Sequence, residues 1–220
     1  MPKTIQVLVV DDSTFMRKSL SAMLTSDPRI AVAGMARNGE EALQQVKALK
    51  PDVVTMDVEM PGMNGIEAVR RIMAEFPVPI VMVSSLTTEG AADTLKALEY
   101  GAIDFIPKQL DGVATNIVEI ERELVAKIVG ASQATGKLAI RRSSAPMATL
   151  VKPAGGALSA HSISVTRGNR IVAIGCSTGG PQALMEVLPK LPADFPAAIV
   201  IVQHMPKTFT KPFADRMNQI

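Results

Sequence analysis

The sequence predicts an α/β protein in which two parallel-sheet units are joined by a linker. Up to about residue 130, five largely apolar runs alternate with five amphipathic segments, which is the pattern of a doubly wound sheet covered by helices on both faces. Polar residues follow these runs, at the carboxyl ends of strands where such sheets collect functional groups. Beyond residue 166, an apolar run, a glycine-rich turn and a helical pattern begin a second α/β unit. We therefore expect domains at 1–130 and 167–220, with a flexible linker at 131–166.

The first unit contains a full alternation of strands and helices. Its longest apolar runs are nearly uninterrupted, so the corresponding strands should be buried on both faces. Between them, apolar residues recur at helical spacing. The strands are expected at 7–10, 31–33, 52–56, 80–83 and 103–106, and the helices at 14–24, 40–49, 66–75, 90–99 and 113–129.

Five polar residues stand at the ends of these predicted strands. They are Asp11 and Asp12 after the first strand, Asp57 at the third, Ser84 at the fourth and Lys108 at the fifth. Three carboxylates at one sheet edge repel one another unless a cation lies among them, and all-oxygen ligands favour Mg²⁺ or Mn²⁺ over zinc. Such a site suits phosphoryl transfer to a carboxylate, because positioning and charge neutralisation supply most of the catalysis.

The third predicted strand runs into the segment MDVEMPGMNG at 56–65. Together with the polar strand ends, this segment makes residues 4–128 resemble the receiver domain of two-component response regulators. The resemblance implies that Asp57 accepts a phosphoryl group. It also implies that the cation is held by Asp11, Asp12, Asp57 and the backbone carbonyl of Glu59.

The same resemblance gives three further residues supporting roles. Ser84 would hydrogen-bond a phosphoryl oxygen, Lys108 would pair with it, and Phe105 would be the aromatic residue that changes rotamer on activation. One position departs from the receiver pattern, because Gln109 follows Lys108 where receivers usually have proline after a frequently cis bond. A cis bond before a residue other than proline costs about 3–4 kcal/mol. Whether this bond is cis or trans stays open, and with it the reach of Lys108.

Residues 131–166 have the composition of a linker. Ser, Thr, Ala, Gly and Pro dominate, with scattered Lys and Arg and no sustained period, and a short helical start is expected to continue from the preceding helix. A flexible coil of about 36 residues spans about 30–36 Å, which lets one unit fold over the active edge of the other. His161 lies in this stretch and is interpreted as a linker residue.

Charge is distributed unevenly along the chain, whose net charge is +2. Residues 1–130 contain 13 Lys and Arg against 18 Asp and Glu, whereas 131–220 contain 10 against 3. Opposite charges favour attraction between the two parts, and a basic part suits an acidic substrate. A basic linker alone would produce part of the same imbalance, since several of these positive charges lie in it.

The second unit begins with a serine in a glycine-rich turn. An apolar run at 171–174 leads into GCSTGGP at 175–181, and a helical pattern follows at 182–188. Unpaired N–H groups at a helix N-terminus favour developing negative charge, so Ser177 is a candidate nucleophile if a base reaches it. The next apolar run ends at His204, and parallel neighbouring strands would place both residues at one sheet edge. Ser177 and His204 therefore suggest a serine hydrolase.

The segment 171–206, with its STGGP turn and its QHMP, resembles the catalytic domain of the bacterial chemotaxis protein-glutamate methylesterase, which is also a glutaminase. That family attaches a receiver domain ahead of the esterase. The resemblance implies a Rossmann-like parallel α/β domain that hydrolyses γ-glutamyl methyl esters and deamidates glutamines on chemoreceptors in the cytoplasm. Ser177 would attack the ester carbonyl, His204 would carry its proton to methanol, and the turn 178–180 would supply oxyanion N–H groups. A chemotaxis histidine kinase would be the phosphodonor.

The second unit is expected to be incomplete. Only two strands, one helix and the start of another, at 213–217, fit between residues 168 and 220, which are too few to bury both faces of a sheet. The chain is therefore expected to be a fragment of a longer protein. The catalytic pair also needs a carboxylate to orient the histidine, and in the family this aspartate comes from later in the chain. Asp194 and Asp215 lie nearby but match no motif.

Three alternatives remain open from the residues. Cys176 competes with Ser177 as nucleophile, although a small residue packed on the sheet explains it more simply. A second alternative is a response regulator whose output domain merely binds a partner, for instance nucleic acid. The sequence shows neither a helix-turn-helix pattern nor an aromatic platform in its favour, since the chain has one Tyr, six Phe and no Trp. A nucleotide phosphate site at Gly175 lacks the full glycine spacing and the acidic residue about 20 positions further on.

Composition argues against a membrane-inserted protein and against one stabilised by internal disulfides. No signal pattern is evident, and no apolar run approaches the ~18 residues of a transmembrane helix, so membrane insertion is not expected. The single cysteine cannot form an internal disulfide, which fits a reducing compartment.

Overall fold

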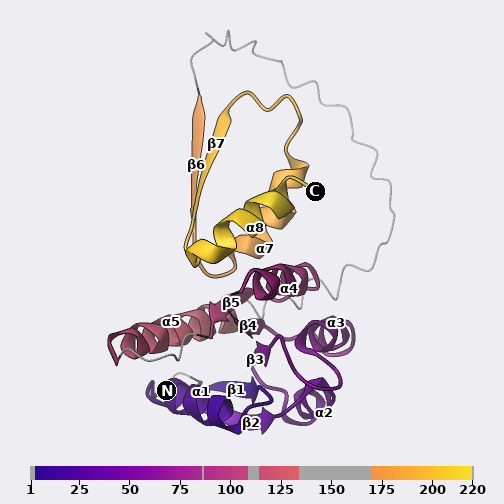
Figure 1. Ribbon diagram of the computed structural model, residues 1–220, viewed down its shortest axis with the longest axis vertical. Coiled ribbons are helices and arrows are strands. Elements are labelled where there is room, and N and C mark those ends of the chain that lie inside the picture. Colours follow the sequence, from indigo (N-terminus) through magenta and orange to yellow (C-terminus); the bar gives the residue numbers. More distant parts are fainter. Residues whose placement is uncertain (1–2, 86, 109–113, 134–169, 220) are drawn as a thin grey trace.

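The computed structural model describes residues 3–85, 87–108, 114–133 and 170–219, and it contains two parallel sheets (Figure 1). The first has five strands in the order β2-β1-β3-β4-β5, and the second pairs β6 with β7. The predicted α/β class is confirmed, with a doubly wound sheet followed by a second, smaller parallel sheet. Gln109, His161 and the stretch 134–166 of the expected linker lie outside the described residues, so the linker stays a prediction.

The first unit, residues 3–133, contains every strand and helix predicted for it. Its strands are β1 (Ile5–Val10), β2 (Ile30–Ala36), β3 (Val53–Asp57), β4 (Ile80–Ser84) and β5 (Asp104–Pro107). Its helices are α1 (Thr14–Thr25), α2 (Gly39–Leu49), α3 (Gly65–Glu75), α4 (Thr88–Glu99) and α5 (Ala114–Ser132). The strand β2 is longer than expected because it pairs along the whole of β1, with one irregularity between Val7 and Leu8.

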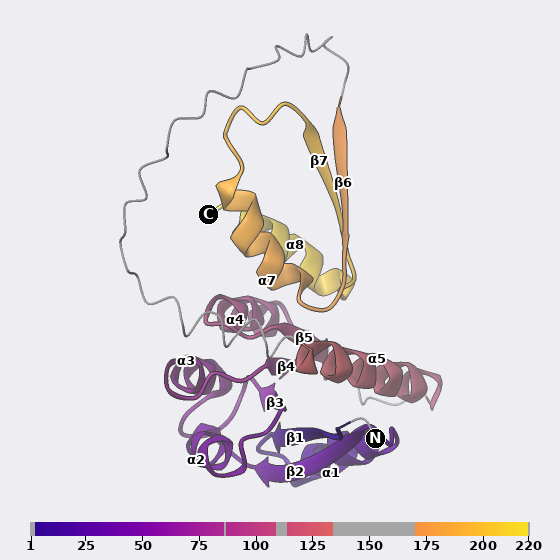
Figure 2. The same ribbon diagram turned by 180° about the vertical axis from the view of Figure 1, so that it is seen from behind.

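Alternating side chains of the strands fill two cores, one on each face of the sheet. Val7 and Val9 of β1 pack with α1 and α5, whereas Leu8 and Val10 pack with α2, α3 and α4. Figures 1 and 2 show the two helical layers on opposite sides of the sheet. None of the four named strand residues is accessible to solvent. Burial of both faces explains why the strand sequences are nearly continuous apolar runs.

Helix starts are fixed close to the strand ends by side-chain caps. Ser13, Asn38, Asn64 and Thr87 each accept a hydrogen bond from the backbone N–H three residues later. The helix α3 also needs Gly65 at its first position, because a Cβ there would lie 1.8 Å from the Asp57 carbonyl oxygen. These starts bring the helix N-termini to the same edge as the polar strand ends.

The second unit, residues 170–219, has one helical layer on its sheet. It comprises β6 (Ile171–Cys176), α7 (Gly180–Val187), the 3-10 helix η1 (Leu188–Lys190), β7 (Ala198–Gln203) and α8 (Lys207–Met217). The helix α8 begins six residues before the expected helical run at 213–217, and it contains Pro212 in its interior. Ile171 and Val202 remain 66% and 70% exposed on the strands. In the described parts of the chain, no helix has the length and apolar character needed to cross a membrane.

Candidate functional site

The first candidate site lies where β1 and β3 end. One carboxylate oxygen from each of Asp11, Asp12 and Asp57 lies within 4.8 Å of the others, and Asp11 and Asp57 are buried. The Ser13 N–H donates to Asp11 Oδ1 at 2.9 Å, and the Glu59 N–H donates to Asp57 Oδ1 at 3.2 Å. The carboxylates are therefore held by backbone groups of the loops that follow the strands.

Lys108, just past β5, is the cation of this cluster. Its Nζ lies 2.7 Å from Asp57 Oδ2 and 3.0 Å from Asp11 Oδ2. Burial raises the pKa of Asp57 to about 6, although the ion pair with Lys108 by itself lowers that pKa. Burial by itself lowers the pKa of Lys108, but the two carboxylates outweigh burial and raise that pKa above its usual value.

One ammonium group does not balance three carboxylates. With all groups ionised, the cluster carries an excess of two negative charges in a largely buried place, and every candidate ligand atom is an oxygen. This donor set and this charge fit a hard divalent cation such as Mg²⁺. The acidic cluster is therefore consistent with the predicted cation site.

The remaining predicted residues of this site lie around the cluster. Glu59, Asp12 and Lys108 line a cavity of about 550 Å³, which Asp93 of α4 also lines. Ser84 is buried at the end of β4, where its hydroxyl donates to the Gly90 carbonyl at 3.1 Å. A role of Ser84 at a phosphoryl group would require this hydroxyl to rotate away from α4.

Arg17 of α1 supports the same site and was missed in the sequence. Its guanidinium donates to the backbone carbonyls of Asp11 at 2.7 Å and Asp12 at 2.9 Å. The side chain thus reaches back along α1 and fixes the turn that carries both carboxylates. Its position one turn into the helix after an Asp-Asp pair is the signal that could have identified it.

The second candidate site lies at the ends of β6 and β7. Cys176 pairs with Gln203 in the parallel register, so Ser177 and His204 each follow directly at the same sheet edge. The His204 N–H donates to the Cys176 carbonyl at 3.0 Å. The structure therefore brings these two residues to neighbouring strand ends, as the sequence predicts.

The turn after Ser177 leads into α7 through Gly179. Gly179 has φ of 75°, a left-handed conformation that favours glycine. The Gly180 N–H donates to the Ser177 carbonyl at 2.8 Å, so the oxyanion candidates are reduced to the N–H groups of Thr178 and Gly179. Burial raises the pKa of the Cys176 thiol, which disfavours the reactive thiolate and argues against Cys176 as nucleophile.

Gln203 joins the two strand ends and was also missed in the sequence. Its side-chain amide donates to the carbonyls of Ser177 and His204, both at 3.1 Å. A Cβ at position 180 would lie 2.1 Å from Gln203 Oε1, so glycine there leaves room for this amide. Gln203 is the last residue of β7 and directly precedes the candidate catalytic histidine. A polar side chain at that position is the signal in the sequence that could have identified the bridge.

An acid for His204 is lacking in the described part of the chain, where no carboxylate is hydrogen-bonded to its imidazole. Asp215 forms an ion pair with Lys211 at 2.6 Å. His204 instead lines a cavity of about 410 Å³ together with Pro107 and Glu123 of the first unit. The His204 edge therefore faces the first unit.

The two units meet along α4, β5 and α5 (Figures 1 and 2). The ring of Phe209 on α8 stacks on Phe105 of β5, with centroids 4.2 Å apart. Thr178, next to Ser177, packs on α5, where a Cβ at Gly130 would lie 3.1 Å from Thr178 Cγ2. The first unit thus contacts both the Ser177 turn and the helix that follows His204.

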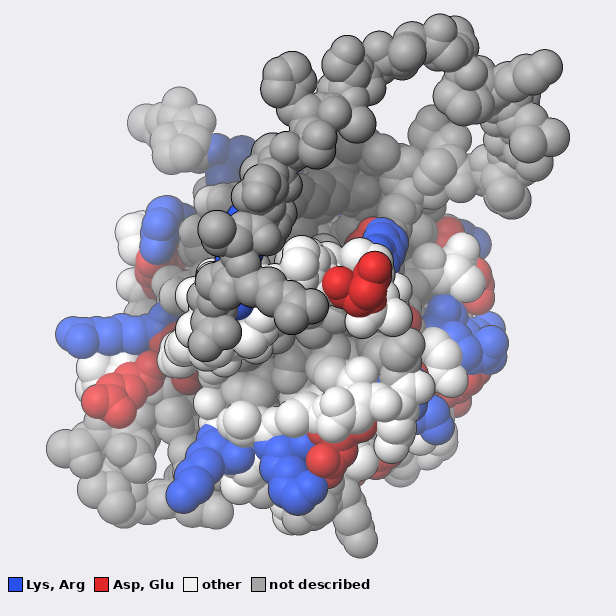
Figure 3. Space-filling model, turned by 90° about the horizontal axis from the view of Figure 1, so that it is seen from above, with Lys and Arg blue, Asp and Glu red and all other residues white. Residues whose placement is uncertain are grey.

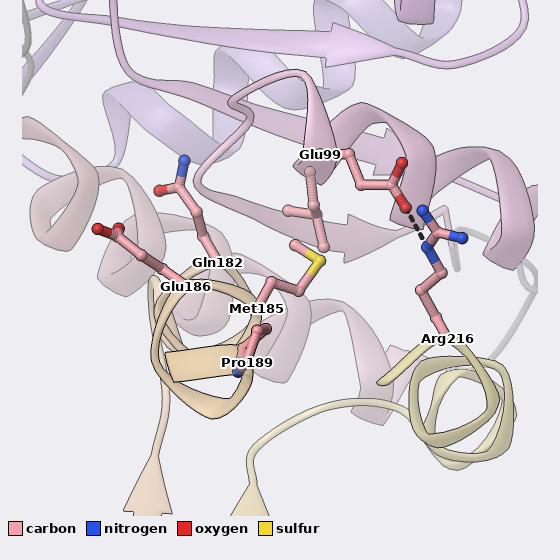
Figure 4. A pocket seen from close by; sticks show the side chains of 7 residues that line it. Glu99, Gln182, Met185, Glu186, Pro189 and Arg216 are labelled. Carbon is pink, nitrogen blue, oxygen red and sulfur yellow. Dashed lines mark ion pairs between the residues drawn. The ribbon is translucent and has the colours of Figure 1, made fainter. Parts of the chain in front are cut away.

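An ion pair and a small cavity complete this contact. Arg216 of α8 pairs with Glu99 of α4 beside a cavity of about 370 Å³ that Leu98, Gln182, Met185, Glu186 and Pro189 also line (Figure 4). The pair joins the acidic first part of the chain to the basic second part, in the direction that the charge distribution predicts.

Comparison with known families gives two matches along the chain. Residues 7–117 match the response regulator receiver domain family. Residues 172–220 match the family described as CheB methylesterase. The first match contains the acidic cluster and the second contains Ser177 and His204.

Relatives carry the same two parts in one chain. The protein-glutamate methylesterase/protein-glutamine glutaminase 1 of Oleidesulfovibrio alaskensis is 50% identical over 98% of this chain and 63% of its own length. The corresponding protein of Pyrococcus horikoshii is 48% identical over 100% of this chain and 58% of its own length. This chain therefore spans about three fifths of the length of these relatives.

A solved structure resembles the first unit. The crystal structure of the response regulator domain of Thermotoga maritima CheB aligns with a TM-score of 0.55 and 48% identity, and it covers 60% of this chain and 98% of that domain.

Proposed function

We propose that this chain is a phosphorylation-regulated protein-glutamate methylesterase and glutaminase of bacterial chemotaxis. The chain belongs to the response regulator receiver domain family, and it continues into a segment that matches the CheB methylesterase family. The observation that carries the proposal is the placement of Ser177 and His204 at paired parallel strand ends, in a unit whose Thr178 packs on the unit that holds the acidic cluster. A chemotaxis histidine kinase is the phosphodonor, and cytoplasmic parts of methyl-accepting receptors are the substrate.

The first unit accepts the phosphoryl group at Asp57. A carboxylate oxygen of Asp57 bonds to phosphorus while the bond from phosphorus to the kinase histidine nitrogen breaks. Asp11, Asp12, Asp57 and the Glu59 carbonyl would hold Mg²⁺ or Mn²⁺, which neutralises charge on the transferred group. Lys108 lies close enough to Asp57 to pair with the new phosphoryl oxygens.

The second unit cleaves the ester at Ser177. The Ser177 oxygen attacks the glutamyl carbonyl while His204 takes the hydroxyl proton, and His204 then gives that proton to the departing methoxide. Water, activated by His204, releases the glutamate carboxylate from Ser177. The N–H groups of Thr178 and Gly179 stabilise the oxyanion. A glutamine side chain follows the same steps and loses ammonia.

On one face of the molecule, the charge pattern gives no support to binding of nucleic acid. The face drawn in Figure 3 intersperses basic and acidic side chains over the described residues, without an extended basic stripe. Phosphate backbones are bound by clustered Lys and Arg. The support for a hydrolytic output comes from the segment that matches the CheB methylesterase family and from the paired strand ends that carry Ser177 and His204.

A chimera tests the proposed activity. Residues 1–220 are joined to the remaining C-terminal part of the Oleidesulfovibrio alaskensis relative, and methanol release from methylated receptor membranes is measured. We expect Ser177→Ala to lower the rate about 10⁴-fold or more, because the nucleophile is lost. Cys176→Ala, the neighbouring control, should keep the rate within a few-fold. Activity of the Ser177→Ala chimera within tenfold of the parent contradicts the assignment.

Contact between the units should inhibit the esterase in the same chimera. Gly130→Leu places a side chain where Thr178 packs, so we expect basal methanol release to rise and phosphodonor stimulation to shrink. Gly130→Ala, which adds one methyl group, should change both much less. Deleting residues 1–130 should raise basal release as well. If deletion leaves release unchanged or lower, steric cover by the first unit is not the mechanism.

A further inference from the structure

A buried ion pair in the first unit belongs to neither candidate site. Lys127 of α5 donates to Asp104 Oδ1 of β5 at 2.9 Å, and the two side chains are 4% and 1% exposed. Glu123 lies 3.7 Å from the same ammonium. Within the described residues, Asp104 Oδ2 is buried without a hydrogen-bond partner. The pair is therefore held in place by one oxygen.

An ion pair that is buried is an energetically unfavourable means of attaching a helix to a sheet. Charges that leave water lose solvation, and apolar replacements of such pairs are often as stable or more stable. The ion pair is thus better explained by a requirement for a defined geometry than by stability alone. The contacts of Asp104 and Lys127 indicate that this geometry is the orientation of Phe105.

Both partners contact Phe105. The same Asp104 Oδ1 accepts the Phe105 backbone N–H at 2.8 Å, and β5 is the edge strand of the sheet. Lys127 Nζ lies 5.6 Å from the centroid of the Phe105 ring, within the range of a cation–π contact. The pair therefore fixes the backbone of Phe105 and attracts its ring.

Phe105 in turn is part of the contact with the second unit. Its ring stacks on Phe209, and both side chains are almost completely buried. Phe209 lies on α8, which begins three residues after His204. A change in the Phe105 rotamer would break the stack and the cation–π contact together.

We propose that Lys127 is a positioning residue for the contact between the two units: the buried Asp104–Lys127 pair holds Phe105 in the orientation that stacks on Phe209. The pair thereby sets the fraction of molecules in which the first unit contacts α8 beside the His204 edge. Its importance for an esterase rests on the proposed function, but the effect on the contact itself does not.

The test uses the full 220-residue chain. Lys127→Met alone would leave the Asp104 charge buried and unpaired, so the variant is the double replacement Asp104→Asn/Lys127→Met, which removes both charges and keeps an acceptor for the Phe105 N–H. Spin labels at positions 49 and 187, whose native residues are 43% and 50% exposed, report the populations of joined and separated units in a Cys176→Ala background.

We expect the equilibrium constant for joining the units to fall about threefold to thirtyfold, which spans the range of cation–π contacts from exposed to desolvated sites. Lys47→Met is the matched control, because Lys47 lies 5.9 Å from the Phe76 ring, away from α8. It should leave the populations unchanged. No change in the double variant, or an equal change in Lys47→Met, overturns the proposal.

A second comparison separates positioning from general loss of stability. The double replacement is combined with Phe209→Leu, which removes the ring that Phe105 contacts. If Lys127 acts through the stack, the two effects combine to less than their product. If they multiply, the ion pair only anchors α5 and the proposal fails. Because no ester is involved, either result stands whether or not the chain is an esterase.

Discussion

Replacing Asp57 with Asn should abolish phosphorylation of this chain by a small phosphodonor such as acetyl phosphate. The amide cannot act as the nucleophile, and Asp57 lies at the centre of the charge cluster formed with Asp11 and Lys108. Incorporation of labelled phosphate should also require Mg²⁺ or Mn²⁺, because only a divalent cation offsets the three carboxylates as the donor approaches. The measurement is acid-labile label on the intact protein.

The controls for this experiment come from the same cavity. Asp93→Asn changes a carboxylate that lines the cavity outside the three-residue cluster, and it should retain most of the labelling. Lys108→Ala should alter the response to phosphorylation rather than remove the acceptor. Equal labelling in the presence of a chelator, or persistent labelling of Asp57→Asn, would show that the receiver assignment of this site is wrong.

The 220 residues by themselves should release methanol from methylated receptor at least about 10⁴-fold more slowly than the chimera described above. Loss of the acid from a catalytic triad with intact geometry costs about that much. In the described residues His204 has no carboxylate hydrogen-bonded to it, and Lys211 already holds Asp215. Phosphorylation of Asp57 should be intact in the same preparation.

Methanol release by the 220-residue chain and by the chimera is compared at equal protein concentration. Turnover within tenfold of the chimera would mean that an acid among these 220 residues completes the site. Asp194→Asn and Asp215→Asn would then be compared first. Glu123→Gln would follow, because Glu123 lines the cavity that contains His204.

Most of the fold follows from patterns that are local in the sequence. The strands β1, β3 and β4 are nearly continuous apolar runs because both of their faces are covered. Asn38 and Asn64 fix helix starts within a residue of prediction. The length of β2 could not be predicted, since it depends on pairing with all of β1. The early start of α8 was hidden by Pro212, which lies inside the helix.

The candidate sites were predictable where one rule applies, that polar groups collect at the ends of parallel strands. That rule identifies Asp11, Asp57 and the Ser177–His204 edge. It does not identify Arg17 or Gln203, whose partners are backbone carbonyls of loops. Phe209 is likewise invisible in the sequence, because its partner Phe105 lies more than 100 positions away.

The two-stranded sheet of the second unit has a consequence for solutions of this chain. Both of its strands have an edge left unpaired in the described residues, and Ile171, Val200 and Val202 present apolar side chains to solvent. Unprotected strand edges with apolar faces are templates for pairing between molecules. The propensity to aggregate should therefore reside in β6 and β7, and the acidic first unit, whose faces are both covered, should be the part that keeps the chain dispersed.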